Sequence, residues 1–199
     1  AETSSYEILK LMHKGGTQNA DTLIQLVEKS KKYGIVPELS FVLGNPTNNV
    51  TRDIETDLKF IKKLKKINPA TEIVIYTYSP VNFEDSEMSL ASKLKGFDYP
   101  TSLEEWVSPK WQNFDLRKHP LTPWLKPHHF KMIRNFEKTL NACYPTNSDL
   151  KIKGWKRTIL KLMGSWRYKL DFYSAPYEIM LTQKLLKYRQ PEIEGFAQS

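Results

Sequence analysis

Residues 35–51 constrain the fold of this chain more than any other stretch. Apolar residues run almost without a break from 35 to 43, which is the pattern of a parallel strand covered on both faces. Gly44-Asn45-Pro46 ends this run, because proline continues neither a strand ladder nor a helix. A polar loop and a helix pattern follow. Ligands of α/β proteins bind in the loops after strands, so this loop is a candidate edge of a site.

The apolar spacing around this strand predicts helices over 6–12, 19–33 and 51–67 and a second strand over 72–78. In the third helix, five lysines are expected to face outward: Lys59, Lys62, Lys63, Lys65 and Lys66. This alternation predicts parallel strands joined by right-handed crossovers. Two strands cannot close a barrel. We therefore expect more strands before residue 1, and expect the chain to be the later part of a larger protein.

The pattern changes after residue 85 and predicts three parts. Residues 1–85 form the strand-containing part, and 86–126 form an irregular connection rich in tryptophan and proline, with short helices. Residues 127–199 form a basic helical region, with helices near 127–143, 150–169 and 175–189. We expect the part of this connection from 107 to 126 to be ordered, since its aromatic side chains would be unfavourable if exposed.

The composition is that of a globular protein, with 40% hydrophobic and 12% aromatic residues among 199. No run of about 18 apolar residues is present to span a membrane. The single cysteine, Cys143, excludes an internal disulfide and cannot by itself hold an iron–sulfur cluster or a structural zinc. We expect a cytoplasmic location, with association to a membrane surface left open.

The net charge of +8 is concentrated in residues 151–169. The basic residues there are Lys151, Lys153, Lys156, Arg157, Lys161, Arg167 and Lys169. The ordinary interpretation is a solvated helix face, but nucleic acid, an anionic membrane or an acidic domain would also suit it. Five apolar residues share a face of this helix, which could lie on a membrane or pack inward: Trp155, Ile159, Leu162, Met163 and Trp166. One functional hypothesis is therefore a non-enzymatic binding module for an anionic membrane or, less favoured, nucleic acid.

The histidines predict no metal site. His128 and His129 are adjacent, so on a helix they point about 100° apart. His13 and His119 have no candidate partners nearby in sequence. We expect these residues to be surface or capping groups.

Three segments in preserved spacing carry a family resemblance. They are Ala1-Glu2-Thr3-Ser4-Ser5 with Lys14-Gly15-Gly16-Thr17 after it, Phe41-Val42-Leu43-Gly44-Asn45-Pro46-Thr47 with Asp53-Ile54-Glu55 after it, and Tyr76-Thr77-Tyr78-Ser79-Pro80. In this order they resemble the fourth-, fifth- and sixth-strand motifs of radical S-adenosylmethionine (radical SAM) enzymes. The resemblance covers residues 1–85.

The resemblance implies a fold class: α/β, the later part of a partial (β/α)₆ TIM-type barrel with parallel strands, followed by an α-helical C-terminal extension. It also implies that a [4Fe–4S] cluster reduces S-adenosylmethionine to a 5′-deoxyadenosyl radical, while the protein orients the reactants and excludes water. The segments Phe97-Asp98-Tyr99-Pro100 and Leu103-Glu104-Glu105-Trp106 resemble the subgroup with an amino-terminal cobalamin-binding domain. Cobalamin, a methylation or cyclisation, and a small-molecule or lipid-like substrate are implied for that subgroup.

The resemblance also assigns site residues. Glu2, Ser4 and Ser5 would contact the methionine or ribose part of S-adenosylmethionine. Val42, Leu43 and Gly44 would lie near the adenine, with Gly44 allowing close approach. Asn45, Tyr76 and Tyr78 would face the substrate. The two tyrosines follow period-two strand geometry, although ordinary core or lip aromatics are the alternative.

Departures from the family pattern limit these expectations. The triad of cluster-binding cysteines is absent, Ser4 stands where the family has glycine, and Thr47-Asn48-Asn49 replaces its Gly-Glu-Thr. The missing triad would belong to the absent N-terminal half of the barrel, which would be the main partner together with a cobalamin-binding domain. We expect the full-length protein to be an enzyme and this chain alone to bind no cluster and to be inactive.

Overall fold

The computed structural model describes residues 2–14, 16, 18–83, 86–112, 121–144 and 153–186. Some sequence features lie outside these residues: Ala1, Gly15, Thr17, His119, Lys151 and the expected helix ends at 150–152 and 187–189. The chain forms two compact units, Ala1–Phe130 and Lys131–Ser199. No helix in the described ranges is long and apolar enough to cross a bilayer.

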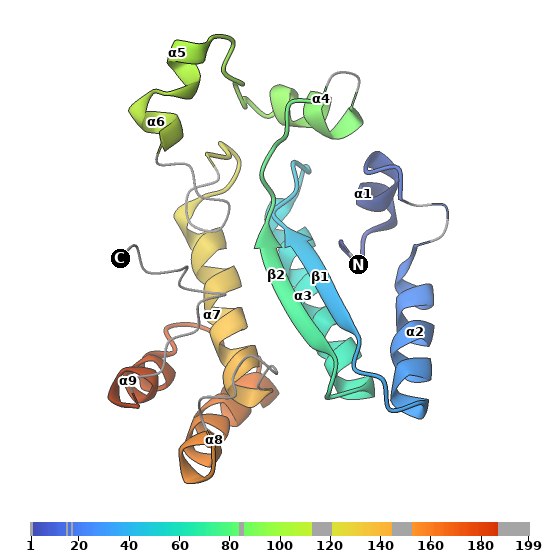
Figure 1. Cartoon of the computed structure of the whole chain (residues 1–199), viewed down its shortest axis with the longest axis vertical. Coiled ribbons are helices and arrows are strands. Elements are labelled where there is room, and N and C mark those ends of the chain that lie inside the picture. The colour runs from blue at the N-terminus through green and yellow to red at the C-terminus, as the bar shows by residue number, and fades with distance from the viewer. Residues whose placement is uncertain are drawn as a thin grey trace. The chain divides into compact units, whose positions relative to one another are not determined.

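The first unit is built on two parallel strands, β1 (Glu38–Leu43) and β2 (Glu72–Thr77), which pair from Glu38 opposite Glu72 to Leu43 opposite Thr77. The helix between them, α3 (Val50–Ile67), packs against one face of this sheet, and α2 (Ala20–Lys32) lies against α3 (Figure 1). Phe41 of β1 and Phe60 of α3 make an edge-to-face contact with ring centroids 6.2 Å apart. Alternate strand residues supply this buried face, as period two requires.

The expected fold class, the later part of a partial (β/α)₆ TIM-type barrel with an α-helical extension, is wrong. The described residues are 57% helical and contain one small sheet of two strands. The two strands and the helix between them were predictable, because each depends on local apolar spacing. The barrel was expected from the family resemblance and not from local spacing.

The first strand is shorter and less covered than its apolar run predicts. Ile35 and Val36 precede β1 and are exposed, at 58% and 47%. Within β1, Leu39, Phe41 and Leu43 are buried while the residues between them are half-buried. The strand therefore buries one face fully, and not both.

Lys65 corrects a second expectation, because it faces inward although it was predicted to face solvent. Its ammonium donates hydrogen bonds to the carbonyl oxygens of Pro69 and Thr71, both at 2.7 Å. These carbonyls lie just after the end of α3, where a cation is favourable. The aliphatic stem of a lysine packs well against apolar neighbours, so burial of Lys65 is tolerated.

Polar caps set where the helices begin. Ser5 accepts from the Ile8 amide at the start of α1 (Tyr6–Leu11), and Asn19 and Thr22 form a reciprocal capping box at the start of α2. Asn49 accepts from Arg52 at the start of α3. Serines cap α4 (Glu87–Leu94) and α5 (Leu103–Trp106), and α6 (Pro109–Gln112) follows. The starts of α1, α2 and α3 lie within one residue of the sequence predictions, because the cap is a local signal.

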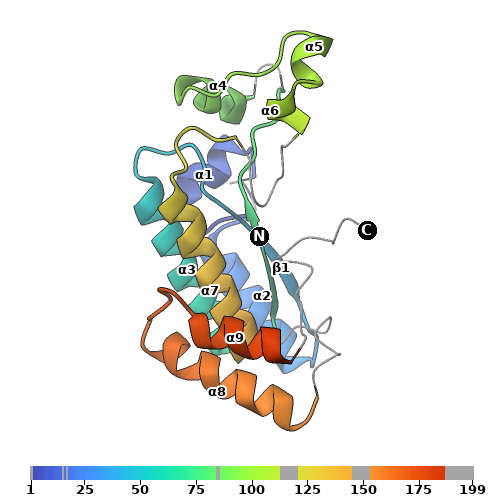
Figure 2. The ribbon, with the colours of Figure 1, turned by 90° about the vertical axis from the view of Figure 1, so that its left-hand side faces the viewer.

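In the second unit, α8 (Trp155–Lys169) and α9 (Tyr177–Leu185) lie side by side beyond α7 (Pro127–Cys143) (Figure 2). Ala142, Leu160 and Ile179, one from each helix, form a fully buried cluster. Arg167 holds the corner between α8 and α9, since its guanidinium pairs with Glu178 and donates to the Ser174 carbonyl at 2.6 Å. Such a charged group is stable in a buried position because its donors are satisfied.

Gly164 allows α8 to approach α7 closely. A Cβ at this position would lie 2.8 Å from the Ala142 Cβ and 2.9 Å from the Cys143 amide nitrogen. We expect Gly164→Ala to lower the free energy of unfolding by about 1–2 kcal/mol, because overpacking against backbone outweighs the gain in helix propensity. Gly16→Ala, where nothing lies within 4 Å, is the control and should change it by less than about 0.5 kcal/mol. Urea unfolding measures both. A stabilising Gly164→Ala would contradict the close approach.

Candidate functional site

Main-chain hydrogen bonds bring three predicted segments to one end of the sheet. The Val42 amide donates to the Glu2 carbonyl at 2.7 Å, and the Tyr78 amide donates to the Leu43 carbonyl at 2.8 Å. In a parallel strand, neighbouring residues bond to opposite sides, so Glu2 lies along the edge of β1 that faces away from β2 (Figure 1). The segments that begin with Glu2, Gly44 and Tyr78 therefore share the carboxyl end of the strands.

Asp57 fixes the first of these segments, and sequence reasoning missed it. Its carboxylate, only 2% exposed, accepts from the Thr3 hydroxyl at 2.9 Å, the Ser4 amide at 2.6 Å and the Ser4 hydroxyl at 2.5 Å. Asp57 falls at helical spacing with Ile54 and Ile61 on the buried face of α3. A carboxylate on an apolar helix face is the signal that could have found it, because such a group needs a buried partner.

The other predicted contacts for S-adenosylmethionine also have partners in the chain. The Ser5 hydroxyl caps α1, and the Glu2 carboxylate pairs with Lys14 near the surface. Ser4 and Ser5 nevertheless line a cavity of about 640 Å³ between α1 and the start of α3. Thr47 and Arg52 line its other side. Polar and apolar groups line this cavity in similar measure, and Arg52 and Asp53 give it both signs of charge.

Gly44 makes the close approach that its sequence position predicts, but to a side chain of the same chain. It has φ +83°, and a Cβ there would lie 2.9 Å from Leu125 Cδ2. The Trp124 indole donates to the Gly44 carbonyl at 2.9 Å. Leu43 is fully buried in the sheet core and Val42 is half-buried. The space beside Gly44 is thus filled by residues 124–125.

The three predicted substrate contacts have different environments. Asn45 is buried and donates through Nδ2 to the Val42 carbonyl at 2.9 Å. Tyr78 is buried beside Ser92, at 3.2 Å between the two hydroxyl oxygens, and burial raises the pKa of its hydroxyl. Tyr76 is 39% exposed, on the face of β2 opposite to the buried Ile75. We call the residues directly after β1 and β2, 44–47 and 78–80, the lip. Tyr78 is therefore a packed part of the lip, and Tyr76 contacts solvent.

Several buried polar atoms near this lip have no hydrogen-bond partner among the described residues. They are Asn45 Oδ1, Thr47 Oγ1, Ser79 Oγ and Thr122 Oγ1. Three of them belong to the segments directly after β1 and β2. Buried polar groups in proteins are nearly always paired, so these atoms are available to a ligand or an ordered water. Sequence reasoning selected Asn45 alone; the position of Ser79 directly after a strand was the signal for that residue.

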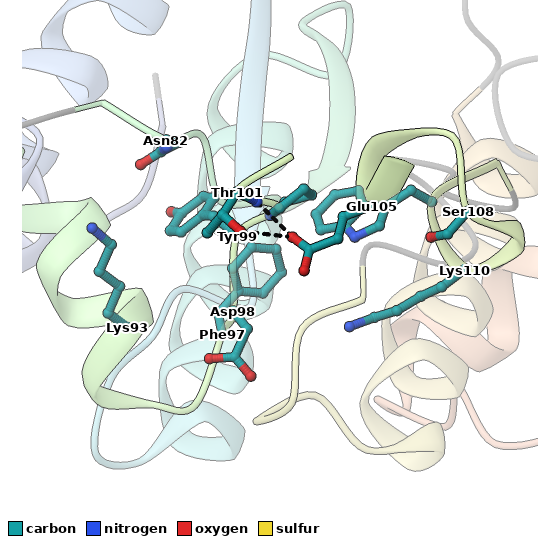
Figure 3. A pocket seen from close by; sticks show the side chains of 11 residues that line it. Asn82, Lys93, Phe97, Asp98, Tyr99, Thr101, Glu105, Ser108 and Lys110 are labelled. Atoms are coloured by element: carbon teal, nitrogen blue, oxygen red, sulfur yellow. Dashed lines mark hydrogen bonds between the residues drawn. The ribbon is translucent and has the colours of Figure 1, made fainter. Parts of the chain in front are cut away.

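A second cavity, of about 920 Å³, lies in the segment that follows β2 (Figure 3). Lys93 of α4 and Lys110 of α6 lie on opposite sides of it, with Asp98 between them (Figure 3). Glu105 accepts from the Thr101 amide at 2.6 Å and hydroxyl at 3.1 Å, and these bonds lower the pKa of its carboxyl. The cavity combines both signs of charge with aromatic rings, which suits a polar organic ligand.

An aromatic layer connects this cavity with the strand ends. The Phe97 ring is buried and lies 4.8 Å from Tyr99 and 6.4 Å from Trp124, measured between centroids. Trp124 in turn lies 6.2 Å from Tyr78. Pairs at these distances attract one another beyond simple burial. Phe97, Tyr99 and Trp124 of the irregular connection are therefore packed in one layer with Tyr78.

His129 and Cys143 do not form a metal centre in the described residues, which contain no group of three or more metal-ligating His, Cys, Asp or Glu side chains. His129 accepts from the Lys126 amide through Nδ1 and lies 2.9 Å from Thr51 through Nε2. Burial lowers the pKa of His129, which keeps the ring neutral and lets Nε2–H donate to Thr51. Cys143 is buried beside Ser165. With one cysteine in the sequence, the donor set does not fit a [4Fe–4S] cluster.

Comparisons with family models, curated proteins and solved structures gave no match to this chain. The resemblance to radical SAM enzymes therefore rests on the three sequence segments alone. A function is therefore proposed from the geometry of the strand ends.

Burial raises the pKa of Asp57 despite the donors around it. The folded protein thus holds this proton more tightly than the unfolded chain, so stability falls as pH rises from about 4 through the folded pKa. We expect Asp57→Asn to flatten this fall, measured as urea midpoints between about pH 4 and pH 7. Glu55→Gln, an exposed carboxylate on the same helix, should keep the wild-type profile. A profile that Asp57→Asn leaves unchanged would contradict the buried carboxylate.

The close contact between Gly44 and Leu125 can be tested by comparison with a second glycine of similar backbone conformation. Gly96 has nearly the same φ, +82°, but nothing lies within 4 Å of its Cβ position. We expect Gly96→Ala to cost about 1–2 kcal/mol of unfolding free energy from backbone strain alone. Gly44→Ala should cost at least about 1 kcal/mol more, because the new methyl collides with Leu125. Equal losses in urea unfolding would show that Leu125 does not press on Gly44.

Proposed function

We propose that residues 2–83 form part of the S-adenosylmethionine-binding region of a radical SAM enzyme. The observation that carries the proposal is the common edge of the three resembling segments. The bonds from Val42 to Glu2 and from Tyr78 to Leu43 bring them to one end of two parallel strands. In α/β proteins this is the end at which ligands bind.

The unpartnered buried atoms support a polar ligand there. Asn45 Oδ1 can accept from an amine or hydroxyl, and the Thr47 and Ser79 hydroxyls can donate or accept. S-adenosylmethionine offers an ammonium, a carboxylate and ribose hydroxyls to such groups. Because Leu125 fills the space beside Gly44, the proposal assigns this glycine to packing and not to an adenine contact.

In this proposal, the ligands of the [4Fe–4S] cluster come from outside these 199 residues, since the sequence has a single cysteine. The cluster would supply the electron that cleaves S-adenosylmethionine. The described residues would bind and orient the polar end of that molecule and shield it from water. The 920 Å³ cavity beyond the aromatic layer offers room for a small-molecule substrate, and cobalamin remains part of the proposal through the resemblance of residues 97–106.

The test uses the protein from its native source, with its complete coding sequence determined. After anaerobic reconstitution with iron and sulfide, dithionite and S-adenosylmethionine are added, and 5′-deoxyadenosine is measured. We expect 5′-deoxyadenosine to form, and Asn45→Ala with Ser79→Ala to raise the KM for S-adenosylmethionine about 10-fold, through the loss of two hydrogen bonds. Thr158→Ala, an exposed hydroxyl on α8, is the control and should leave KM unchanged.

Two results would overturn the proposal. One is a coding sequence without a C-x₃-C-x₂-C segment, because no such segment lies in this chain. The other is a cluster-loaded protein that forms no 5′-deoxyadenosine.

A further inference from the structure

Helix α8 exposes large apolar side chains on the side that faces away from its buried residues. Its buried residues include Leu160, Gly164 and Tyr168, and they face the rest of the second unit. On the opposite side of the helix, Trp155 and Leu162 are each 65% exposed and Trp166 is 43% exposed. At 100° per residue these three lie within about 40° of one another, so they form one stripe. We call Trp155, Leu162 and Trp166 the α8 stripe.

Helix α9 repeats this arrangement. Ile179 and Gln183 are buried, while Tyr177, Leu181 and Leu185 are exposed and recur at every fourth position. Scattered exposed apolar residues are ordinary, but continuous exposed stripes on two neighbouring helices mark an interaction surface.

Lysines border the α8 stripe. Lys156 and Lys161 lie about 100° away from it on either side, and Lys169 lies near its end; all three are exposed. The helix contains no acidic residue. Arg167 is different, because it is buried and paired with Glu178. The exposed side of α8 is therefore apolar along its centre and positive along its margins.

We propose that the α8 stripe and its bordering lysines bind an anionic membrane surface. Tryptophan side chains are favoured at the boundary between headgroups and acyl chains, where the ring is buried and the indole N–H stays hydrated. Lysines at the margins extend to lipid phosphates while their stems cover apolar surface. Charge complementarity selects this occupant over a second copy of the same chain, since two such basic faces would repel each other.

The test measures binding of the 199-residue chain to vesicles by flotation. The vesicles contain either phosphatidylcholine alone or phosphatidylcholine with phosphatidylserine, at rising sodium chloride. We expect binding to the anionic vesicles only, weakened by salt. Lys156→Gln/Lys161→Gln/Lys169→Gln should weaken it about 100-fold, at roughly 1 kcal/mol for each lysine near the surface. The control Lys59→Gln/Lys63→Gln/Lys66→Gln removes the same charge from exposed sites on α3 and should bind like the wild type.

The contribution of the apolar side chains is tested with a second pair of double variants, one in the α8 stripe and one outside it. Trp155→Ala/Leu162→Ala should abolish most of the binding, while Leu90→Ala/Leu94→Ala, which removes exposed leucines from α4, should not. Both substituted pairs are exposed, so circular dichroism should show an unchanged fold. Equal binding of all variants would overturn the proposal, and so would binding of single-stranded RNA without vesicle binding. A lipid-free dimer that Trp155→Ala/Leu162→Ala converts to a monomer would assign the stripe to self-association and overturn it as well.

Discussion

The carboxylate of Asp57 is the interaction on which the strand-end arrangement depends. It joins Thr3 and Ser4 to the middle of α3, across more than 50 residues of sequence. The same segment is also bonded to β1, because the Val42 amide donates to the Glu2 carbonyl. Burial makes the charged form of this carboxylate costly and raises its pKa, and the three donor groups around it offset part of that cost. The geometry of the strand ends therefore depends on a group that packs as part of the helix core.

Much of the local structure could be predicted from the sequence, because its causes are local. Helix starts follow from caps such as Asn19 and Ser102, and the end of β1 follows from Gly44-Asn45-Pro46. Ile35 and Val36 were misplaced because an apolar run does not say where pairing begins. The barrel was wrong for a different reason: it was expected from the family resemblance, and the described residues form one sheet of two strands.

The ends of the strands, where a site is proposed, could be predicted from the sequence, but the contacts made there could not. The family resemblance assigned Asn45, Tyr76 and Tyr78 to the substrate, and strand periodicity placed them at or near the ends of the two strands. It could not reveal that Trp124, 80 residues away, would bond to the Gly44 carbonyl, because that contact depends on how the irregular connection folds back. It could not separate Tyr76 from Tyr78 either, since both fit the same period and only the packing around Ser92 distinguishes them.

These contacts also define how a ligand could reach the lip. Leu125 and Trp124 cover Gly44, and the aromatic layer that includes Phe97 lies beyond them. Thr47, by contrast, lines the 640 Å³ cavity beside α1 and carries one of the unpartnered buried hydroxyls. A small molecule that satisfies the polar atoms after β1 would therefore enter between α1 and α3, past Ser4 and Ser5, and not over the glycine. On this route the buried Asp57 is a wall of the entrance, so the group that fixes Thr3 and Ser4 also borders the space that a ligand would fill.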